Sequence, residues 1–388
     1  MMESWKASRR QLLAQGTSAA GLTAIGLVAG GFSWPVLAAQ TTPGSESASP
    51  VANGQFSLDP TPPSALGAPP VPAATASTAP DATSETDAFA PYENYGTDAA
   101  PGEFPRVVRH AFGETVIEQQ PERIVALDAG ELDTVMYLGL TPVGAVEFEF
   151  ERFPAQMADR ARQISVTGSL DEPDIEAIIG LRPDLVISSA LRHDETVYAN
   201  LAATAPTVFS SGPGVTFKHN FKLYAQAMGR EAEARALLDR YEDGVRALNA
   251  DLPTPRPTTS IVQIRTDHVR YYQRANFLGQ VLTDLGFPRN DAENVDDFAY
   301  FGSQEELGTH ANGEFLILAV SDPGENNLAT EILDGPIWQV LPATHTGNVL
   351  EAPSEIFIAG VSYGSAMEVL NIIGGHFGID PVIDLASL

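Results

Sequence analysis

The chain of 388 residues contains no cysteine and only three lysines, Lys6, Lys218 and Lys222. Without cysteine it has no disulfide, thiolate metal site, cysteine nucleophile or lipid-modified cysteine. This absence identifies no compartment, because exported proteins are free to do without disulfides. Basic residues are scarce altogether, 22 against 50 acidic residues, for a formal net charge of −28. Such a field repels polyanions, so we expect no nucleic-acid partner.

Several sequence signatures of enzymes and metal sites are also missing. No G-x-G-x-x-G follows a predicted strand, which disfavours a dinucleotide-dependent oxidoreductase. The seven histidines are scattered and form no H-x-x-x-H pair, so the sequence predicts no metal site and no resident cofactor. A zinc- or manganese-binding protein stays open, because clustering in space is not visible in the sequence, and so does haem binding through tyrosine or histidine.

One motif favours catalysis. Gly360-Val-Ser362-Tyr-Gly364 matches the G-x-S-x-G nucleophile elbow, with a strand-like run before it and a helix-like run after it. An exported serine esterase that uses Ser362 is therefore an alternative. The esterase alternative is disfavoured because the candidate acid and histidine after the serine are only Glu368 and His376. They follow Ser362 so closely that no room is left for the strands that normally carry these residues.

The N-terminus resembles an export signal. Residues 8–13, SRRQLL, resemble the twin-arginine motif, and a mild apolar run of fourteen residues follows over 19–32. That run is too short to span a hydrocarbon core of about 30 Å as a stable helix. Residues 36–38, VLA, offer a cleavage site before Ala39. We expect a twin-arginine signal peptide over 1–38 and a protein exported to the periplasm or cell surface; retention of the leader as an anchor is left open.

Residues 39–103 have a different composition. They contain eleven prolines, eight acidic residues and neither lysine nor arginine. Sequence of this kind, without apolar periodicity, cannot bury enough surface to offset its ordering entropy. We predict a disordered, semi-extended spacer. The remaining residues, 104–388, carry 19 basic and 41 acidic side chains, so the folded body has a formal charge of −22.

From Arg106 onward, short apolar runs alternate with amphipathic stretches. This alternation predicts parallel βα units with both faces of each sheet covered. The predicted strands are 123–127, 141–146, 183–189, 260–265, 313–321 and 348–351, and the predicted helices are 131–138, 174–180, 217–228, 231–250 and 275–285. The pattern restarts after the prolines at 253, 255 and 257, so we expect an α/β protein of two lobes with a long helical connector.

Five stretches of this body, in order, resemble the siderophore- and cobalamin-type periplasmic binding proteins. The most specific is GSLDEPDIEAIIGLRPDLVIS at 168–188, an acidic-proline turn, a short helix and an L-R-P-D-L-V-I strand. The others are PERIVAL (121–127), EAEARALLDRYEDGVRAL (231–248), RYYQRANFLGQVLTDLGF (270–287) and PIWQVLPATHTGNVLEA (336–352).

This resemblance implies two Rossmann-like lobes, over 104–228 and 253–388, joined by a backbone helix over 229–252, with a ligand cleft between them and no catalysis. It implies a solute-binding protein, expected to be a monomer, that captures an iron–siderophore complex, a small iron chelate. An ABC importer permease would receive the ligand, which brings the protein close to the membrane. Cobalamin, haem or a metal ion are the alternative ligands.

The resemblance also suggests roles for individual residues. The positions that match the family's permease-docking glutamates are Glu176 and Glu305. An acid at a helix start is also ordinary capping, and Ser303 followed by Glu306 fits a capping box. The candidate ligand-binding residues are Arg192, Arg265, Tyr272 and Phe301. Arginines at strand ends and aromatic faces suit an oxygen-rich ferric complex, whereas surface ion pairs or core packing would be their ordinary roles.

Overall fold

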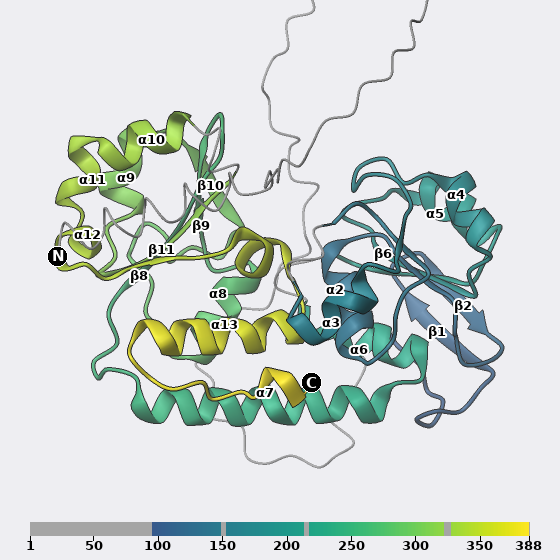
Figure 1. The fold of residues 1–388 in the computed structure, drawn as a ribbon. Coiled ribbons are helices and arrows are strands. Elements are labelled where there is room, and N and C mark those ends of the chain that lie inside the picture. Colours follow the sequence, from purple (N-terminus) through teal and green to yellow (C-terminus); the bar gives the residue numbers. More distant parts are fainter. Residues whose placement is uncertain (1–94, 149–152, 213–216, 322–326, 388) are drawn as a thin grey trace, which may run out of the picture. The chain divides into compact units, whose positions relative to one another are not determined.

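Two five-stranded sheets, each with helices on its faces, organise the described part of the chain (Figure 1). This computed structural model describes residues 95–148, 153–212, 217–321 and 327–387. The predicted leader 1–38 and residues 39–94 of the predicted spacer lie outside the described residues. No helix among the described residues is both long enough and apolar enough to cross a membrane.

The first sheet and its helices form lobe one, with parallel strands in the order β5-β4-β3-β6-β7. The strands are β3 (Ile124–Ala126), β4 (Gly144–Ala145), β5 (Ser165–Val166), β6 (Leu185–Ser189) and β7 (Thr207–Ser210). The helices are α2 (Ala129–Tyr137), α3 (Ala155–Ala161), α4 (Ile175–Leu181), α5 (Glu195–Ala202) and α6 (Phe217–Met228). Strand β6 is buried at every position, as expected for a parallel strand covered on both faces. The predicted βα units of lobe one are confirmed.

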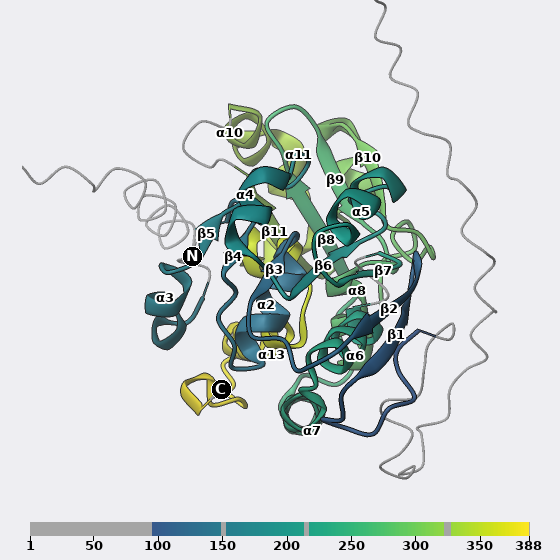
Figure 2. The same ribbon diagram turned by 90° about the vertical axis from the view of Figure 1, so that its right-hand side faces the viewer.

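An antiparallel hairpin that the sequence reading missed precedes lobe one: β1 (Arg106–His110) and β2 (Gly113–Ile117) (Figure 2). Ahead of it, Gly96 exchanges two backbone hydrogen bonds of 2.8 Å with Arg109. Arg109 also donates to both carboxylate oxygens of Asp98, at 2.7 and 2.9 Å. Residues 95–103 are therefore attached to the folded body, although their composition suggested the spacer 39–103. Backbone pairing and a bidentate ion pair order a segment that has little apolar surface of its own.

The second sheet and its helices form lobe two, with strand order β10-β9-β8-β11-β12. The strands are β8 (Thr259–Ile264), β9 (Val269–Tyr272), β10 (Ala299–Gly302), β11 (Phe315–Val320) and β12 (Val349–Glu351). Its helices are α8 (Phe277–Asp284), α9 (Leu307–His310), α10 (Asn327–Asp334), α11 (Pro336–Val340) and α12 (Pro342–Thr346), with short helical turns η2 (Gln304–Glu306), η3 (Glu355–Ala359) and η4 (Leu385–Ser387). Strands β8, β11 and β12 are parallel, as predicted.

Two local predictions in lobe two were incomplete or wrong. Strands β9 and β10 add an antiparallel edge, because the backbone turns straight back after β8, where the Arg265 amide donates to the His268 carbonyl at 2.9 Å. The strand-like run before Ser362 is a single π-helical turn, η3, and not a strand. A short apolar run is ambiguous between strand and helix, and periodicity alone does not decide it.

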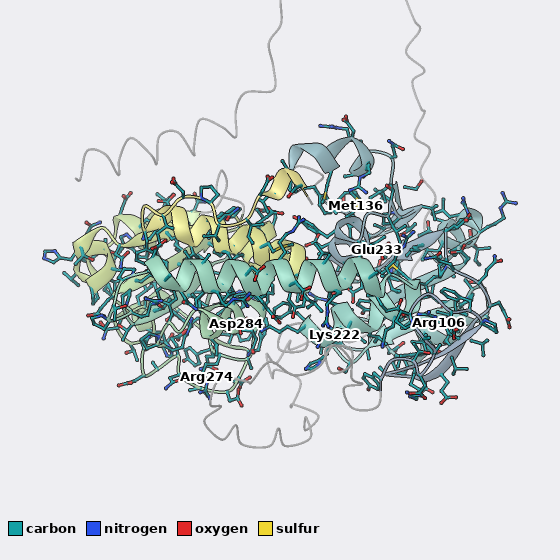
Figure 3. The ribbon with its side chains drawn as sticks, turned by 90° about the horizontal axis from the view of Figure 1, so that it is seen from below. Arg106, Met136, Lys222, Glu233, Arg274 and Asp284 are labelled. Atoms are coloured by element: carbon teal, nitrogen blue, oxygen red, sulfur yellow. The ribbon has the colours of Figure 1, made fainter. Side chains whose placement is uncertain are left out.

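Helix α7 (Glu231–Asp251) is the predicted long connector, and its apolar stripe, including Leu237, Tyr241 and Leu248, is buried. Figure 3 shows helix α13 (Tyr363–His376) lying alongside α7. Although α13 follows lobe two in the sequence, it also packs against α2 and α6 of lobe one. The two lobes therefore meet over a shared helical base, and the predicted architecture of two Rossmann-like lobes joined by a backbone helix is confirmed.

Side chains from both lobes meet within this base. The carboxylate of Asp284, at the end of α8, accepts hydrogen bonds from Lys218 of α6 and Tyr241 of α7, both at 2.6 Å. Nearby, the rings of Phe217 in α6 and Phe277 in α8 make an edge contact with 5.0 Å between centroids. Aromatic packing and a partly buried ion pair thus hold the floor between the lobes.

Candidate ligand-binding site

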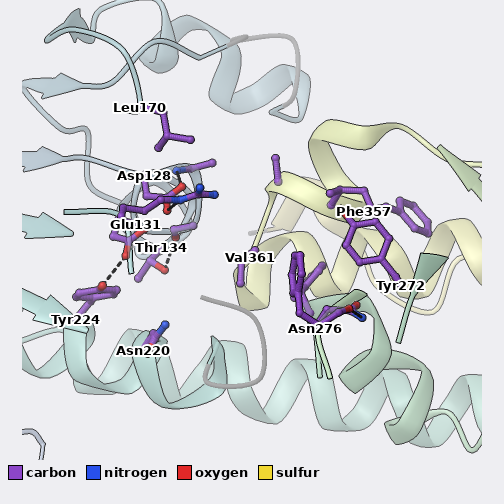
Figure 4. Close-up of a pocket in the computed structure, with 17 residues that line it drawn as sticks. Asp128, Glu131, Thr134, Leu170, Asn220, Tyr224, Tyr272, Asn276, Phe357 and Val361 are labelled. Carbon is purple, nitrogen blue, oxygen red and sulfur yellow. Dashed lines mark hydrogen bonds and ion pairs between the residues drawn. The ribbon is translucent and has the colours of Figure 1, made fainter. Parts of the chain in front are cut away.

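A cavity lies between the two lobes and encloses about 800 Å³ of empty space, including the part that is open to solvent (Figure 4). Aromatic side chains with a few polar groups among them line this cavity, as is usual for sites that bind small ligands. Lobe one contributes Asp128, Ala129, Gly130, Glu131, Thr134, Leu170, Arg192, Asn220 and Tyr224 to its lining. The opposite wall consists of Tyr272, Asn276, Phe277, Phe298, Phe357, Ile358, Ala359 and Val361.

The lobe-one wall lies at the carboxyl ends of β3 and β6, the edge where open α/β sheets bind ligands. Asp128 follows β3 and caps α2, since its Oδ1 accepts from the Ala129 amide at 2.7 Å. Its Oδ2 accepts from Nε of Arg192, in the turn after β6, at 3.0 Å. The Asp128 side chain is 8% exposed and that of Arg192 is 40% exposed. The guanidinium is thus held in place at the cavity by a buried carboxylate.

A second carboxyl group, that of Glu131, lies deeper in the same wall. Its Oε1 is 2.5 Å from the hydroxyl of Tyr224, and that hydroxyl lies 2.7 Å from the backbone oxygen of Ser188. Burial, and then the neighbouring charge of Asp128, raise the pKa of Glu131 to about 8. The wall therefore contains one balanced ion pair and one carboxyl group that resists ionisation.

The lobe-two wall is aromatic with polar edges. The Tyr272 ring packs edge-on against Phe298, with 5.4 Å between centroids, and its hydroxyl donates to Oε1 of Gln263 at 2.9 Å. Asn276 caps α8, because its Oδ1 accepts from the Gly279 amide at 2.9 Å. Aromatic faces beside amide groups can bind both the rings and the oxygen atoms of a ligand.

Next to this wall, the lobe-two sheet carries two arginines, Arg270 in β9 and Arg265 directly after β8. In the strand register Arg270 of β9 lies between Gln263 of β8 and Phe301 of β10, so these side chains share a face with Tyr272. The Arg270 guanidinium lies 5.2 Å from the centre of the Phe301 ring. Burial raises the pKa of the Tyr272 hydroxyl, whereas a hydrogen bond from Arg270 and the charges of Arg270 and Arg265 oppose this rise. Both guanidinium groups thus act on a side chain that lines the cavity.

This architecture, with a cavity between two α/β lobes above a long helix, matches that of known proteins. The family model described as periplasmic binding protein matches residues 124–356. The chain belongs to the periplasmic binding protein family. Members of this family bind solutes for transporters and are not enzymes.

Three similar proteins are informative for this periplasmic binding protein. The probable siderophore-binding lipoprotein YfiY of Bacillus subtilis (strain 168) is 27% identical over 285 residues, which are 70% of this chain and 87% of YfiY. The Fe(3+)-citrate-binding protein YfmC of the same strain is 26% identical over 263 residues, 67% of this chain and 82% of YfmC. The structure of Staphylococcus aureus SirA complexed with staphyloferrin B aligns with a TM-score of 0.62 and 29% identity, over 71% of this chain and 99% of SirA.

The four candidate ligand-binding residues divide into two pairs. Arg192 and Tyr272 line the cavity of the periplasmic binding protein. Arg265 and Phe301 do not line it but lie on the adjoining sheet face, where Phe301 is 55% exposed. Ligand contact by these four residues stays a prediction.

The sequence reading missed several lining residues: Asp128, Glu131, Asn220, Tyr224 and Asn276. Asp128 could have been found, since it directly follows a buried strand and so lies at the edge where ligands bind. Tyr224 could not, because its place in an amphipathic helix is also that of an ordinary core residue.

The two candidate docking residues are both exposed and outside the cavity lining. Glu176 lies in the first turn of α4. Glu305 lies in η2, where its Oε2 accepts from the hydroxyl of Ser303 at 2.7 Å. The capping box predicted for Ser303 and Glu306 is confirmed. Docking by the two glutamates stays a prediction.

Ser362 is a helix cap of the periplasmic binding protein and not a nucleophile. Its Oγ accepts from the Ser365 amide at 3.1 Å at the start of α13, and the residue is 1% exposed. The charged group near it is the carboxylate of Asp133, 3.5 Å away, to which it donates. A serine that caps a helix and donates to an acid lacks the base that would activate it, so the esterase alternative is wrong.

Among the described residues, no three histidine, aspartate or glutamate side chains are grouped so that they could hold a metal ion. Histidine side chains in this part of the structure instead make local bonds. The His193 ring, for example, is hydrogen-bonded to the hydroxyl of Ser188 at 2.8 Å and to the carbonyl of Leu170 at 3.1 Å.

Proposed function

We propose that this periplasmic binding protein captures a ferric siderophore complex outside the cytoplasm and delivers it to an ABC importer. The proposal is carried by the cavity between the lobes, bordered by Arg192 on one side and by the Arg265–Arg270 face on the other. Guanidinium groups and aromatic rings bind the oxygen-rich, often anionic surface of such complexes. The names of YfiY, YfmC and the SirA complex support the same class of ligand.

The ligand in this proposal is a complex of low net charge, of the hydroxamate or mixed type. The body carries a formal charge of −22, which opposes the approach of a tri-anionic catecholate complex. The arginines at the cavity override this field only over a screening distance of about 8–10 Å. The iron complex is cargo, and the proposal includes no resident cofactor.

A titration of intrinsic fluorescence tests the proposal. The panel contains ferric hydroxamate, catecholate, mixed-ligand and citrate complexes, cobalamin, haem and free divalent metal ions. We expect saturable quenching by a hydroxamate, mixed or citrate complex at concentrations where the other ligands have no effect. Tight catecholate binding alone would overturn the assignment of ligand charge, and selective binding of cobalamin, haem or a metal ion would overturn the siderophore assignment.

The proposal extends to export and delivery. The twin-arginine-like motif within residues 1–38 supports export, and the exposed Glu176 and Glu305 support docking of a monomeric binding protein on a permease. N-terminal sequencing of the exported protein checks the leader: a mature chain that begins at Ala39 is expected, and an intact N-terminus would contradict cleavage.

A further inference from the structure

Glu131 is an acidic residue in the wall of the cavity that we propose holds a ferric complex. It belongs to the first turn of α2, lines the cavity and is 5% exposed. A buried negative charge at this place would repel an anionic ferric complex as well as the nearby carboxylate of Asp128. The protonation state of Glu131 therefore matters for the choice of ligand.

The two short contacts of the Tyr224 hydroxyl indicate the protonation state of Glu131. The hydroxyl of Tyr224 has one hydrogen but two acceptors within reach, the Ser188 backbone oxygen at 2.7 Å and Oε1 of Glu131 at 2.5 Å. The hydroxyl can donate its hydrogen to only one of them, and a carbonyl oxygen can never donate, so only the carboxyl group of Glu131 can supply a second hydrogen. The shorter contact, that with Glu131, then requires a hydrogen from the carboxyl group. Both contacts are satisfied together when Glu131 is a neutral acid that donates to Tyr224.

The charged groups around Glu131 agree with this arrangement. Asp128, at the end of β3, opposes ionisation, whereas Arg192, in the turn after β6, favours it. These two charges form an ion pair with each other, so little of the Arg192 charge is left for Glu131. Burial is the largest influence and the charge of Asp128 the next, and they raise the pKa of Glu131 to about 8 although the Tyr224 hydrogen bond and the Arg192 charge act to lower it.

Other titratable groups on the elements packed around α2 act elsewhere. His193, in the same turn as Arg192, interacts with Asp128. Glu368, on α13, faces Asp133 of α2. Across the cavity, Tyr272 is bonded to Gln263. None of these groups supplies a positive charge that would hold Glu131 ionised.

We propose that Glu131 determines the charge of the ligand: it stands in the cavity wall as a neutral carboxylic acid bonded to Tyr224, and ionisation of this acid expels an anionic ferric complex. The inference rests on the proposed function. With Asp128 and Arg192 balanced and Glu131 uncharged, the lobe-one wall carries no net charge, and Arg265 and Arg270 give the site its positive potential. This local balance explains how so acidic a protein binds an anion.

The test compares ferric citrate binding at pH 7 and pH 9 for the wild type, Glu131→Gln and Glu195→Gln. Glu195 is a matched control, since it also lies in the first turn of a helix but is exposed and outside the cavity. An acid that titrates near pH 8 is about one-tenth protonated at pH 9, so the wild type should bind roughly tenfold more weakly there than at pH 7. The Glu195→Gln variant should lose the same fraction of its affinity between pH 7 and pH 9 as the wild type.

Glu131→Gln keeps an uncharged side chain that can donate to Tyr224. Its affinity at pH 9, taken relative to its own affinity at pH 7, should show no loss beyond that caused by the ferric citrate itself. Calorimetry in buffers of different ionisation enthalpy gives a second readout that needs no variant: at pH 9 the wild type should take up about 0.9 proton per ligand bound. Equal pH dependence in the wild type and Glu131→Gln, or no proton uptake, would overturn the inference.

The state of Glu131 can also be measured without any ligand. In carbon-13 NMR of the δ-carboxyl groups, the resonance that Glu131→Gln removes should titrate near pH 8, and titration in the ordinary acidic range would overturn the inference. If ferric citrate fails to bind while another complex of the panel binds, the inference that Glu131 determines the charge of the ligand is wrong, but the proposed function stands. If no complex binds, the proposed function fails, and the NMR titration still decides whether Glu131 is neutral.

Discussion

At the scale of single residues, the cavity combines groups with ordinary roles into a binding surface. Asp128 is a helix cap, Arg192 is its ion-pair partner and Tyr272 packs against Phe298. Each interaction is common in folded proteins. Asp128 and Arg192 lie at the carboxyl ends of parallel strands, the edge where such sheets bind ligands, and Tyr272 lines the same cavity from lobe two.

Arg265 has a feature that an ordinary surface arginine lacks. Its Nε is buried and has no hydrogen-bond partner among the described residues. A charge-assisted bond from this side chain to the ligand is worth roughly 1.5–3 kcal/mol, so Arg265→Ala should weaken ligand binding by that amount. The thermal midpoint of the ligand-free protein should hardly change. Titration calorimetry and thermal unfolding measure both quantities.

Arg246→Ala is the control for this variant, because the Arg246 side chain is 69% exposed on α7 and pairs with Asp243. It should change neither affinity nor stability. Unchanged affinity in Arg265→Ala would remove Arg265 from the site. A large loss of stability would instead assign it to a structural role.

At the scale of elements, the contact between α13 and α2 explains the second glycine of the G-V-S-Y-G motif, Gly364. A Cβ atom at Gly364 would overlap the ring of Tyr137 in α2. One residue on, Ser365 donates to Oδ2 of Asp133 at 2.7 Å, in a buried contact between the same helices. The motif thus serves close helix packing where α13 crosses from lobe two to lobe one.

Replacement of Gly364 by alanine should therefore destabilise the protein by more than about 1 kcal/mol, because Tyr137 must leave its position or α13 must shift. Gly375→Ala in the same helix is the matched control, since a Cβ there meets no atom within 4 Å. Helix propensity predicts that Gly375→Ala is neutral or stabilising. Chemical denaturation compares the two variants, and equal stability would contradict the proposed packing role.

At the scale of the whole molecule, topology places the two docking candidates on equivalent positions. Glu176 lies at the start of α4, which leads into β6, and Glu305 lies just before α9, which leads into β11. Helices of βα units run antiparallel to their strands, so both glutamates lie at the carboxyl edges of their sheets, one on each lobe. Neither is buried in its own lobe.

The double variant Glu176→Ala, Glu305→Ala should keep its ligand affinity, since neither side chain lines the cavity. Uptake through the importer should fall sharply, because each lost carboxylate leaves a permease charge unpaired. Arginine at either position should reduce uptake further through repulsion. The control is Glu122→Ala, Glu314→Ala, two exposed acids at the amino ends of β3 and β11. Normal uptake by the first double variant would refute docking through these residues.

Buried carboxyl groups also make the stability of the whole protein depend on pH. Burial raises the pKa of Glu131, Glu293 and Glu368 to about 8. Each such group stabilises the fold fully below its unfolded pKa of 4.5, and this stabilisation is lost as the pH rises toward 8. Burial lowers the pKa of His110 and His219 to about 4, and their contribution changes only below pH 6.5.

Between pH 6.5 and 8, only the three glutamates among these groups change the free energy of unfolding. Each lowers it by up to about 1.4 kcal/mol per pH unit. The thermal midpoint should fall over this range, and Glu368→Gln should make the fall less steep. Differential scanning calorimetry of both proteins measures the slopes. A midpoint that is constant from pH 6.5 to 8 would show that these acids are ionised in the folded state.

The sequence by itself determined the α/β class, the two lobes and the connector α7, because these depend on the periodicity of apolar side chains and on prolines that end helices. It also predicted the capping box at Ser303, which is a local interaction. By contrast, it gave no sign of the hairpin β1–β2 or of the attachment of residues 95–103, since both depend on backbone pairing and not on side-chain pattern.

Only the tertiary structure decided the composition of the site. Glu131 and Tyr224 are 93 residues apart in the sequence, and their contact exists because α6 packs against α2. Likewise, Ser362 has the sequence context of a nucleophile, and only its position at the start of α13 beside Asp133 makes it a cap. Periodicity determines which face of an element is buried, whereas the chemistry of a side chain depends on which distant residues the fold places against it.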